Sequence, residues 1–162
     1  MDIKSAGPRD DYAHTVMSHN QVSGDGIWET ETDNVKNTVL QACGARRSHD
    51  FHASLPPLVV LSDGTIAPMI TIAVKPVYRM LEPRIASARN GGQPLSRIDI
   101  ISIPNGLLLT QKPNYLKSYP SLLFPGKDDK GKNPLKLRAR VSCEVLRHID
   151  CWRVQSIPVP YP

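Results

Sequence analysis

Basic side chains that recur at every second position are the residues of this sequence with the clearest chemical potential. Between Leu135 and His148, lysine and arginine alternate with apolar residues, so an extended strand would gather the charges on one face. Ammonium and guanidinium groups in a row attract phosphate, either in a nucleic acid or in lipid headgroups. The predicted site for anionic surfaces consists of Lys127, Lys130, Lys132, Lys136, Arg138 and Arg140.

The composition around these residues favours non-specific attachment. Aromatic residues make up 6% of the chain, so the stacking platforms that hold the bases of single-stranded RNA are largely absent. An anionic membrane surface is an alternative ligand to nucleic acid. A solvated basic face that discourages edge-to-edge strand pairing would explain the same residues without any ligand.

Motifs for nucleotide and metal binding are incomplete. Residues 126–133 approach the phosphate-binding pattern G-x-x-x-x-G-K-[ST], but Asn133 replaces the hydroxyl that would hold magnesium, and Pro134 leads into a strand instead of a helix. Cys43, His49 and His52 offer a thiolate and two imidazoles without a second ligand pair. We therefore predict no metal site and no other cofactor.

Groups for nucleophilic catalysis are equally sparse. The sequence contains no G-x-S-x-G motif, and His148 and Asp150 lie beside Cys151 only as neighbours in a polar corner. They would form a catalytic site only if the fold gathered them around one cavity. We predict no catalytic residue and keep a small hydrolase as the third hypothesis.

A four-residue peptide lies in the proline-rich stretch before the basic residues. Tyr119-Pro120-Ser121-Leu122 resembles the tyrosine-proline-x-leucine peptides by which some viral structural proteins recruit host budding machinery. The resemblance implies an exposed linear motif that binds a host adaptor protein.

These residues must be positioned by a fold that is rich in extended segments. A chain of 162 residues suits one domain with its own core, and 15 prolines against 10 glycines favour strands and turns over long helices. We predict an α+β domain with a mainly antiparallel sheet, built from hairpins, with one or two short amphipathic helices.

The individual elements follow from spacing and turn residues. Helical spacing predicts one helix over residues 33–44. From Pro76 to residue 88 it predicts a helix kinked at Pro83, or two short helices. Turn signals at 62–64 and 104–106 predict two hairpins, the second joining strands 97–103 and 107–110. Residues 111–134 read as a long loop. Strand 135–148 then pairs with residues 151–157.

Charge is distributed unevenly along the chain. Residues 1–50 carry five lysines and arginines against eight acidic residues, whereas residues 51–162 carry fifteen against seven. We predict a flexible acidic arm over residues 1–29, a single α+β domain over 30–157 and a proline-rich tail over 158–162. The opposite charges of arm and body suggest self-association into a homo-oligomer.

The cysteines and apolar runs indicate where the protein is made. Three cysteines in different contexts and no signal-like N-terminal stretch predict a reducing, cytoplasmic compartment. The longest apolar runs span only a few residues, so contact with a membrane would be peripheral, or the protein would lie within a virion.

Together these patterns favour a non-enzymatic structural or assembly protein, similar in its properties to a viral matrix protein, that self-associates and docks on anionic surfaces. The alternative is a module that binds nucleic acid without sequence preference.

Overall fold

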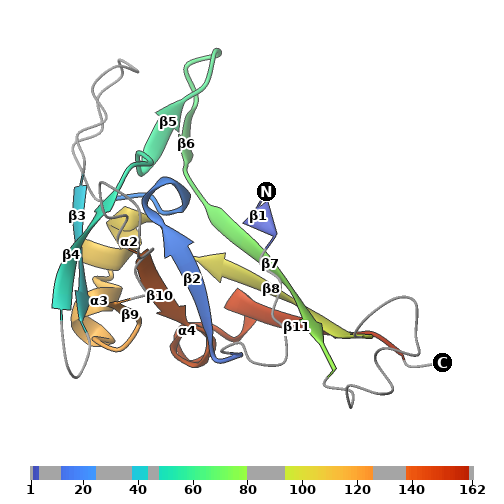
Figure 1. The fold of residues 1–162 in the computed structure, drawn as a ribbon. Coiled ribbons are helices and arrows are strands. Elements are labelled where there is room, and N and C mark those ends of the chain that lie inside the picture. The colour runs from blue at the N-terminus through green and yellow to red at the C-terminus, as the bar shows by residue number, and fades with distance from the viewer. Residues whose placement is uncertain are drawn as a thin grey trace, which may run out of the picture.

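The computed structural model describes residues 2–3, 12–24, 38–43, 48–79, 94–125 and 138–160 of the chain. Within these residues, the backbone forms a four-stranded sheet, a three-stranded sheet and two separate hairpins (Figure 1). The strand order is β1-β7-β8-β11 in the first sheet and β2-β10-β9 in the second, while β3 pairs with β4 and β5 with β6.

The strands are β1 (Asp2–Ile3), β2 (His14–Ser18), β3 (Thr38–Cys43), β4 (Ser48–Ala53), β5 (Leu58–Val60), β6 (Ile66–Pro68), β7 (Thr71–Tyr78), β8 (Leu95–Ile103), β9 (Leu123–Pro125), β10 (Arg138–Ser142) and β11 (Val154–Pro158). The helices are α2 (Gly106–Thr110), α3 (Tyr115–Ser118) and α4 (Cys143–Ile149), with 3-10 turns η1 (His19–Gln21) and η2 (Cys151–Arg153). None of the described helices is long and apolar enough to span a membrane.

The four-stranded sheet has two faces that the register defines. Ala73, Ile101 and Val154 lie side by side on β7, β8 and β11, and all three are buried against the core. We call this side the inner face. Because side chains alternate along each strand, Val74 and its neighbour Ile100 lie on the opposite side, the outer face. β1 extends the sheet by parallel pairing with β7, whereas the other strand pairs are antiparallel.

The hydrophobic core lies between the inner face and the three-stranded sheet. Buried side chains come from both sheets, from the short helices and from β4. They include Met17, Phe51, Ile101, Ile103, Leu109, Leu123, Ala139, Val141 and Leu146. Several of these side chains are completely inaccessible to solvent, so this core is what holds the strands of the two sheets in place.

Both predicted helices are wrong within the described residues. Residues 38–43 form β3, which pairs with β4 over six residues, and Pro76 lies within β7 opposite Ile98. Apolar residues at helical spacing also suit a strand, and the pairing with a neighbouring strand decides between the two. Residues 80–88 of the second predicted helix, with Pro83, lie outside the described residues.

The predicted hairpin around residues 104–106 is wrong as well. Residues 107–110 belong to α2, because the side chain of Asn105 accepts a hydrogen bond from the Leu108 N–H at 3.2 Å and caps the helix. The predicted loop 111–134 contains α3 and β9 in its described part, residues 111–125. Asn105, which follows Pro104, thus caps a helix instead of forming part of a hairpin turn.

The predicted strand 135–148 is confirmed over residues 138–142 and wrong over residues 143–148, while residues 135–137 lie outside the described part of the chain. Ala139 and Val141 are buried as its alternation requires, but Ser142 ends β10 and its hydroxyl accepts from the Val145 N–H at 3.2 Å, which caps α4. β11 does not return to β10. It pairs with β8 of the other sheet instead.

Other expectations are confirmed in part. The mainly antiparallel sheets with few short helices agree with the predicted fold class, and strand 97–103 lies within β8. Residues 12–24, which we placed in the arm, contain β2 in the three-stranded sheet, with Met17 buried. The division into arm, body and tail otherwise stays a prediction.

The hairpin of β5 and β6 forms where the Asp-Gly signal predicted it. Gly64 has a φ of +83°, and the Asp63 side chain accepts a hydrogen bond from the Thr65 N–H at 2.9 Å. Hydrogen bonds from Thr65 hold the pKa of Asp63 below its ordinary value. The turn is therefore wider than a two-residue one, with glycine at its left-handed position.

Gly64→Ala should destabilise this hairpin by about 1 kcal/mol, because a left-handed backbone is strained for alanine. An added Cβ would meet no atom within 4 Å, so the cost is purely conformational. Hydrogen exchange of the β5 and β6 amides should speed up while exchange in β8 stays constant. Equal acceleration in both elements would contradict this interpretation.

Candidate nucleic-acid interface

Arg138 and Arg140 project from the central strand of the three-stranded sheet. β10 pairs with β2 on one side and with β9 on the other, and Arg140 lies between Val16 and Phe124 in the register. Both arginines are half-buried, while the alternate residues of β10 point into the core. Two residues along a strand span about 7 Å, so the two guanidinium groups start from neighbouring points on one surface.

The flanking strands hold this pair in place. On β2, the His14 ring packs edge-on against Phe124 of β9 with 4.5 Å between the ring centroids. Since β10 has a paired strand on each side, the backbone that carries the two arginines is fixed by hydrogen bonds on both edges. The two arginines that the sequence singled out therefore share one supported surface, whereas the predicted Lys127, Lys130, Lys132 and Lys136 lie outside the described residues.

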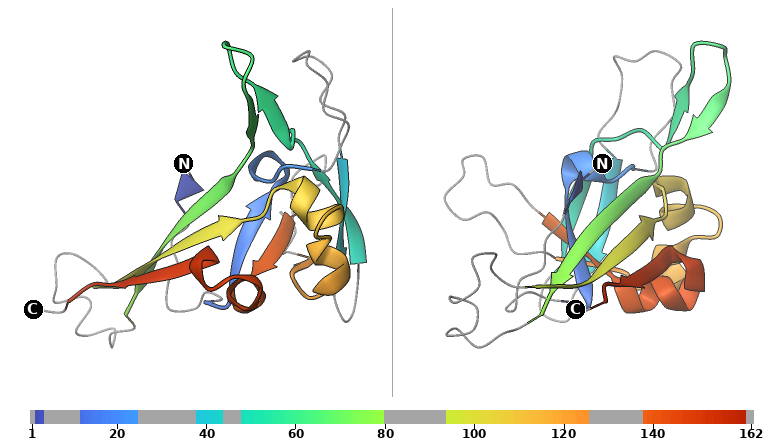
Figure 2. Two further views of the ribbon diagram at one scale, coloured as in Figure 1. Left: turned by 180° about the vertical axis from the view of Figure 1, so that it is seen from behind. Right: turned by 90° about the vertical axis from the view of Figure 1, so that its right-hand side faces the viewer.

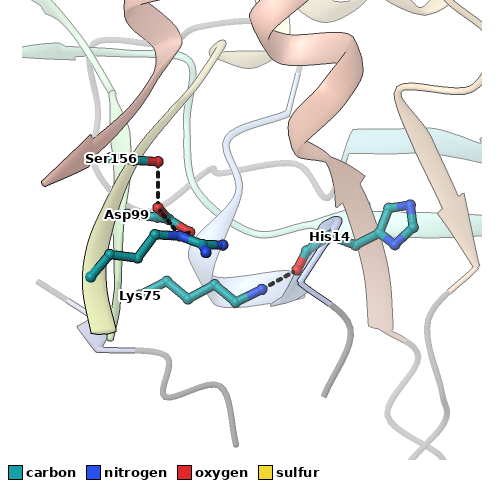
Figure 3. A network of polar contacts seen from close by, with 5 residues as sticks. His14, Lys75, Asp99 and Ser156 are labelled. Atoms are coloured by element: carbon teal, nitrogen blue, oxygen red, sulfur yellow. Dashed lines mark hydrogen bonds and ion pairs between the residues drawn. The ribbon is translucent and has the colours of Figure 1, made fainter. Parts of the chain in front are cut away.

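A network of polar groups joins this sheet to the four-stranded sheet (Figure 3). The Lys75 ammonium on the inner face is buried and donates to the backbone carbonyl of His14 at 2.7 Å. Asp99 lies opposite Lys75 on β8, and its carboxylate accepts from Ser156 at 2.6 Å and from Arg97 at 3.0 Å. Buried charge is thus paired with hydrogen-bonding partners from three strands.

This network is not evident from the sequence alone. Arg97 and Asp99 alternate on one strand, which indicates that they can pair, but the spacing of 24 residues between Lys75 and Asp99 does not indicate that these two lie opposite each other. Only the antiparallel register of β7 and β8 brings them opposite each other.

Lys75→Met should destabilise the protein by about 1–3 kcal/mol, because the His14 carbonyl loses a buried donor. Urea unfolding of the variant measures this loss. Lys117→Met is the matched control, since Lys117 is exposed on α3 and its substitution should change stability little. Equal effects of the two substitutions would contradict a structural role for the buried ammonium.

The predicted linear motif is folded into the body of the protein. Leu122 is fully buried in the core, and its N–H donates to the Tyr119 carbonyl at 2.9 Å. The Tyr119 ring packs against His148, while Pro120 and Ser121 are exposed. An adaptor protein could reach Leu122 only after this segment unfolded, so the buried position of Leu122 speaks against an accessible peptide.

The candidate hydrolase residues are not gathered at one cavity. The Asp150 carboxylate accepts a hydrogen bond from Arg153 at 2.9 Å, and His148 packs on Tyr119. Among the described residues, no group of three or more histidine, cysteine, aspartate or glutamate side chains is placed to hold a metal ion. The side chains of His49 and His52 are not described.

Comparison with known proteins identifies relatives for almost the whole chain. The family model described as restriction endonuclease BglI matches residues 1–157. The type II restriction enzyme BglI of Bacillus subtilis is 43% identical over 151 residues, which cover 92% of this chain and 50% of that enzyme. The chain thus spans about half the length of the curated relative that it matches.

Solved structures agree with this result. The crystal structure of BglI bound to its DNA recognition sequence superposes with a TM-score of 0.81 at 43% identity, over 97% of this chain and 52% of the other. Tetrameric SfiI bound to cognate DNA has a TM-score of 0.63 at 17% identity, over 98% of this chain and 52% of the other, which shows a shared fold.

These matches overturn the main functional prediction. The non-enzymatic structural protein with matrix-like, viral character is wrong, and so is the prediction that the protein is not an enzyme, because the matching family consists of restriction enzymes. Nucleic acid as a partner and a homo-oligomer agree with what the relatives' descriptions say of those proteins. A membrane surface, a virion and a host adaptor find no support among them.

Proposed function

Because this chain belongs to the restriction endonuclease BglI family, we propose that it is part of a type II restriction endonuclease that reads duplex DNA and hydrolyses its phosphodiester bonds. The observation that carries the proposal is the pair Arg138 and Arg140 on β10, which lies within the matched residues. A relative of similar sequence was solved on its DNA recognition sequence. Cleavage of DNA by this protein would agree with the expected cytoplasmic location.

Half-buried arginines on a central strand suit the reading of base edges. A guanidinium group donates two parallel hydrogen bonds, and the acceptors O6 and N7 of guanine match this geometry in the major groove. Paired strands on both edges of β10 fix the backbone that carries the two arginines, so less entropy is lost on binding. We therefore assign base recognition to Arg138 and Arg140.

The lysines predicted from the sequence would serve a different purpose. Lys127, Lys130, Lys132 and Lys136 carry point charges on flexible stems, which suits contacts to phosphate groups. Such contacts position DNA and make affinity depend on salt, but they carry no sequence information. In this arrangement the predicted lysines position the DNA backbone, and Arg138 and Arg140 read its bases.

Hydrolysis of a phosphodiester needs a carboxylate near the scissile bond, to activate water or to hold a divalent cation. Asp99 and Asp150 are each bound to an arginine, and Asp63 is held in the β5-β6 turn by Thr65. Asp2 lies on β1, opposite Ala73 in the register, and Lys4 follows two residues later in the sequence. We propose Asp2 as the catalytic carboxylate.

Among the described residues, no group of three or more histidine, cysteine, aspartate or glutamate side chains could hold a metal ion. What the chain contributes is the placement of its elements. The Lys75 contact to His14 ties β2, and with it β10, to the sheet that carries β1. DNA held on β10 is thereby kept in a constant position relative to Asp2.

Selection from a pool of random duplexes tests the proposal. The chain should enrich duplex DNA with a common short sequence, with affinity that falls steeply as salt increases. Single-stranded RNA and liposomes with anionic lipids should bind more weakly. Enrichment of no sequence, or equal binding to liposomes, would contradict the reading of DNA by this chain.

A further inference from the structure

The outer face of the four-stranded sheet is apolar and exposed. Its positions follow from the register: Val74 lies opposite Ile100, and Ile157 lies opposite Ile98. Ile72 and Ile157 are 51% and 48% exposed, and the aliphatic side chains of Val74, Ile98 and Ile100 between them are half-buried. Five aliphatic side chains from three neighbouring strands thus form one surface, and β7, β8 and β11 lie side by side in both views of Figure 2.

An antiparallel sheet with one solvated face normally carries polar residues on it. β8 departs from this rule, because Ile98 and Ile100 lie on the outer face while Ile101 and Ile103 lie on the inner face. Apolar residues on both faces are typical of a strand that is covered on both sides. The β8 sequence therefore indicates that the outer face is buried in the functional protein.

The outer face continues into a groove beside β2. This groove has a volume of about 540 Å³ and is bounded by η1, the segment before β5 and the first half of β7. Its lining residues are Asn20, Gln21, Leu55, Ile70, Thr71, Ile72 and Val74. Ile70 is 58% exposed at its rim. An apolar side chain of a partner would fill the groove against Leu55, Ile70 and Ile72.

The outer face lacks the positive charge that binding of DNA would require. Between Ile72 and Ile157, the other outer-face positions of β7, β8 and β11 are Pro76, Ser102 and Gln155. None of these described outer-face residues is charged. An uncharged apolar surface attracts a protein surface of the same kind, because both lose contact with water on association.

The matched relatives indicate which protein surface this is. This chain covers 50% of the Bacillus subtilis enzyme and 52% of the solved BglI chain, so about half of each relative has no counterpart in the match. We infer that the outer face docks an apolar surface of a polypeptide equivalent to that unmatched half.

Co-expression of this chain with the unmatched portion of the Bacillus subtilis enzyme tests the inference. We expect a one-to-one complex by size-exclusion chromatography with light scattering. Ile72→Glu and Ile157→Glu should each weaken association at least about tenfold, since each would bury a charge without a partner. Ile66→Glu is the matched control: Ile66 is 54% exposed on β6, outside this face, and its substitution should leave the complex intact.

A fusion of the two portions through a glycine-serine linker gives a second readout. Ile72→Glu should leave the melting temperature of the chain alone nearly unchanged, because Ile72 is half exposed there, and should lower that of the fusion by several degrees. Equal shifts of the melting temperature in the chain and in the fusion would overturn the inference. Failure to form a complex, together with no difference between the two shifts, would also overturn it. If the chain self-associates and Ile72→Glu abolishes that self-association, the inference is also overturned, because a second copy of the chain would then cover the outer face. None of these outcomes depends on DNA binding.

Discussion

Arg138→Ala combined with Arg140→Ala is expected to reduce affinity for the selected duplex by roughly 10²–10⁴-fold, since each bidentate contact to a base contributes about 1–3 kcal/mol of discrimination. Binding to random duplex DNA should fall much less. The preference for the selected sequence should therefore collapse in fluorescence anisotropy titrations at constant salt. Both arginines are half-buried beside β2 and β9, so circular dichroism must first show that the double variant is folded.

Charge-matched substitutions distinguish base reading from general attraction. Arg147 and Lys117 are exposed on α4 and α3, away from β10, and their double alanine variant removes the same net charge. It should retain the sequence preference. By contrast, each of Lys127→Ala and Lys132→Ala should weaken all duplexes alike and reduce the salt slope by about 1. If the control variant loses the preference to the same extent, the assignment of Arg138 and Arg140 fails.

Asp2→Asn should slow cleavage of a plasmid that carries the selected sequence by about 10²–10⁴-fold, which is the range typical of a lost acid–base group. Affinity for DNA should stay within about threefold, because the change affects the reacting bond and not the β10 surface. The measurement is made on the chain alone and on its complex with the unmatched portion of the Bacillus subtilis enzyme.

Asp63→Asn is the control for this variant, because Asp63 is an exposed carboxylate that supports only the β5-β6 turn. Its cleavage rate should equal that of the unmodified protein. Cleavage by Asp2→Asn at the unmodified rate would exclude Asp2 as the catalytic carboxylate. Absence of cleavage in both arrangements would contradict the proposed endonuclease activity itself.

The proposed function assigns base reading to β10 and cleavage to β1, and a link between the two sheets joins these two elements. β10 carries the arginines and β1 carries Asp2, and they are not neighbours in either sheet. Lys75 connects the sheets through the carbonyl of His14, and Asp99 is held beside it by Ser156 and Arg97. A buried polar network of this kind specifies one relative position of the sheets more sharply than apolar contacts alone.

Local patterns in the sequence determined the elements whose formation depends on nearby residues. The hairpin of β5 and β6 forms at the Asp-Gly signal, although its turn is wider than predicted, and the strand at residues 97–103 and the alternation of Ala139 and Val141 are present as predicted. The same alternation singled out Arg138 and Arg140. In each case the signal is the backbone preference of a turn or the period of two of a strand, which acts within a few residues.

Tertiary structure decided everything that depends on a distant partner. Residues 38–43 became a strand because β4 pairs with them, Asn105 became a helix cap, and β11 joined β8 instead of β10. The pairing of β2 with β10 joins segments about 120 residues apart, and no local pattern encodes such a register. The alternation that places Arg138 and Arg140 on one side of β10 could therefore be recognised from the sequence, whereas the contact of Lys75 with the His14 carbonyl, which joins the two sheets, depended on the fold.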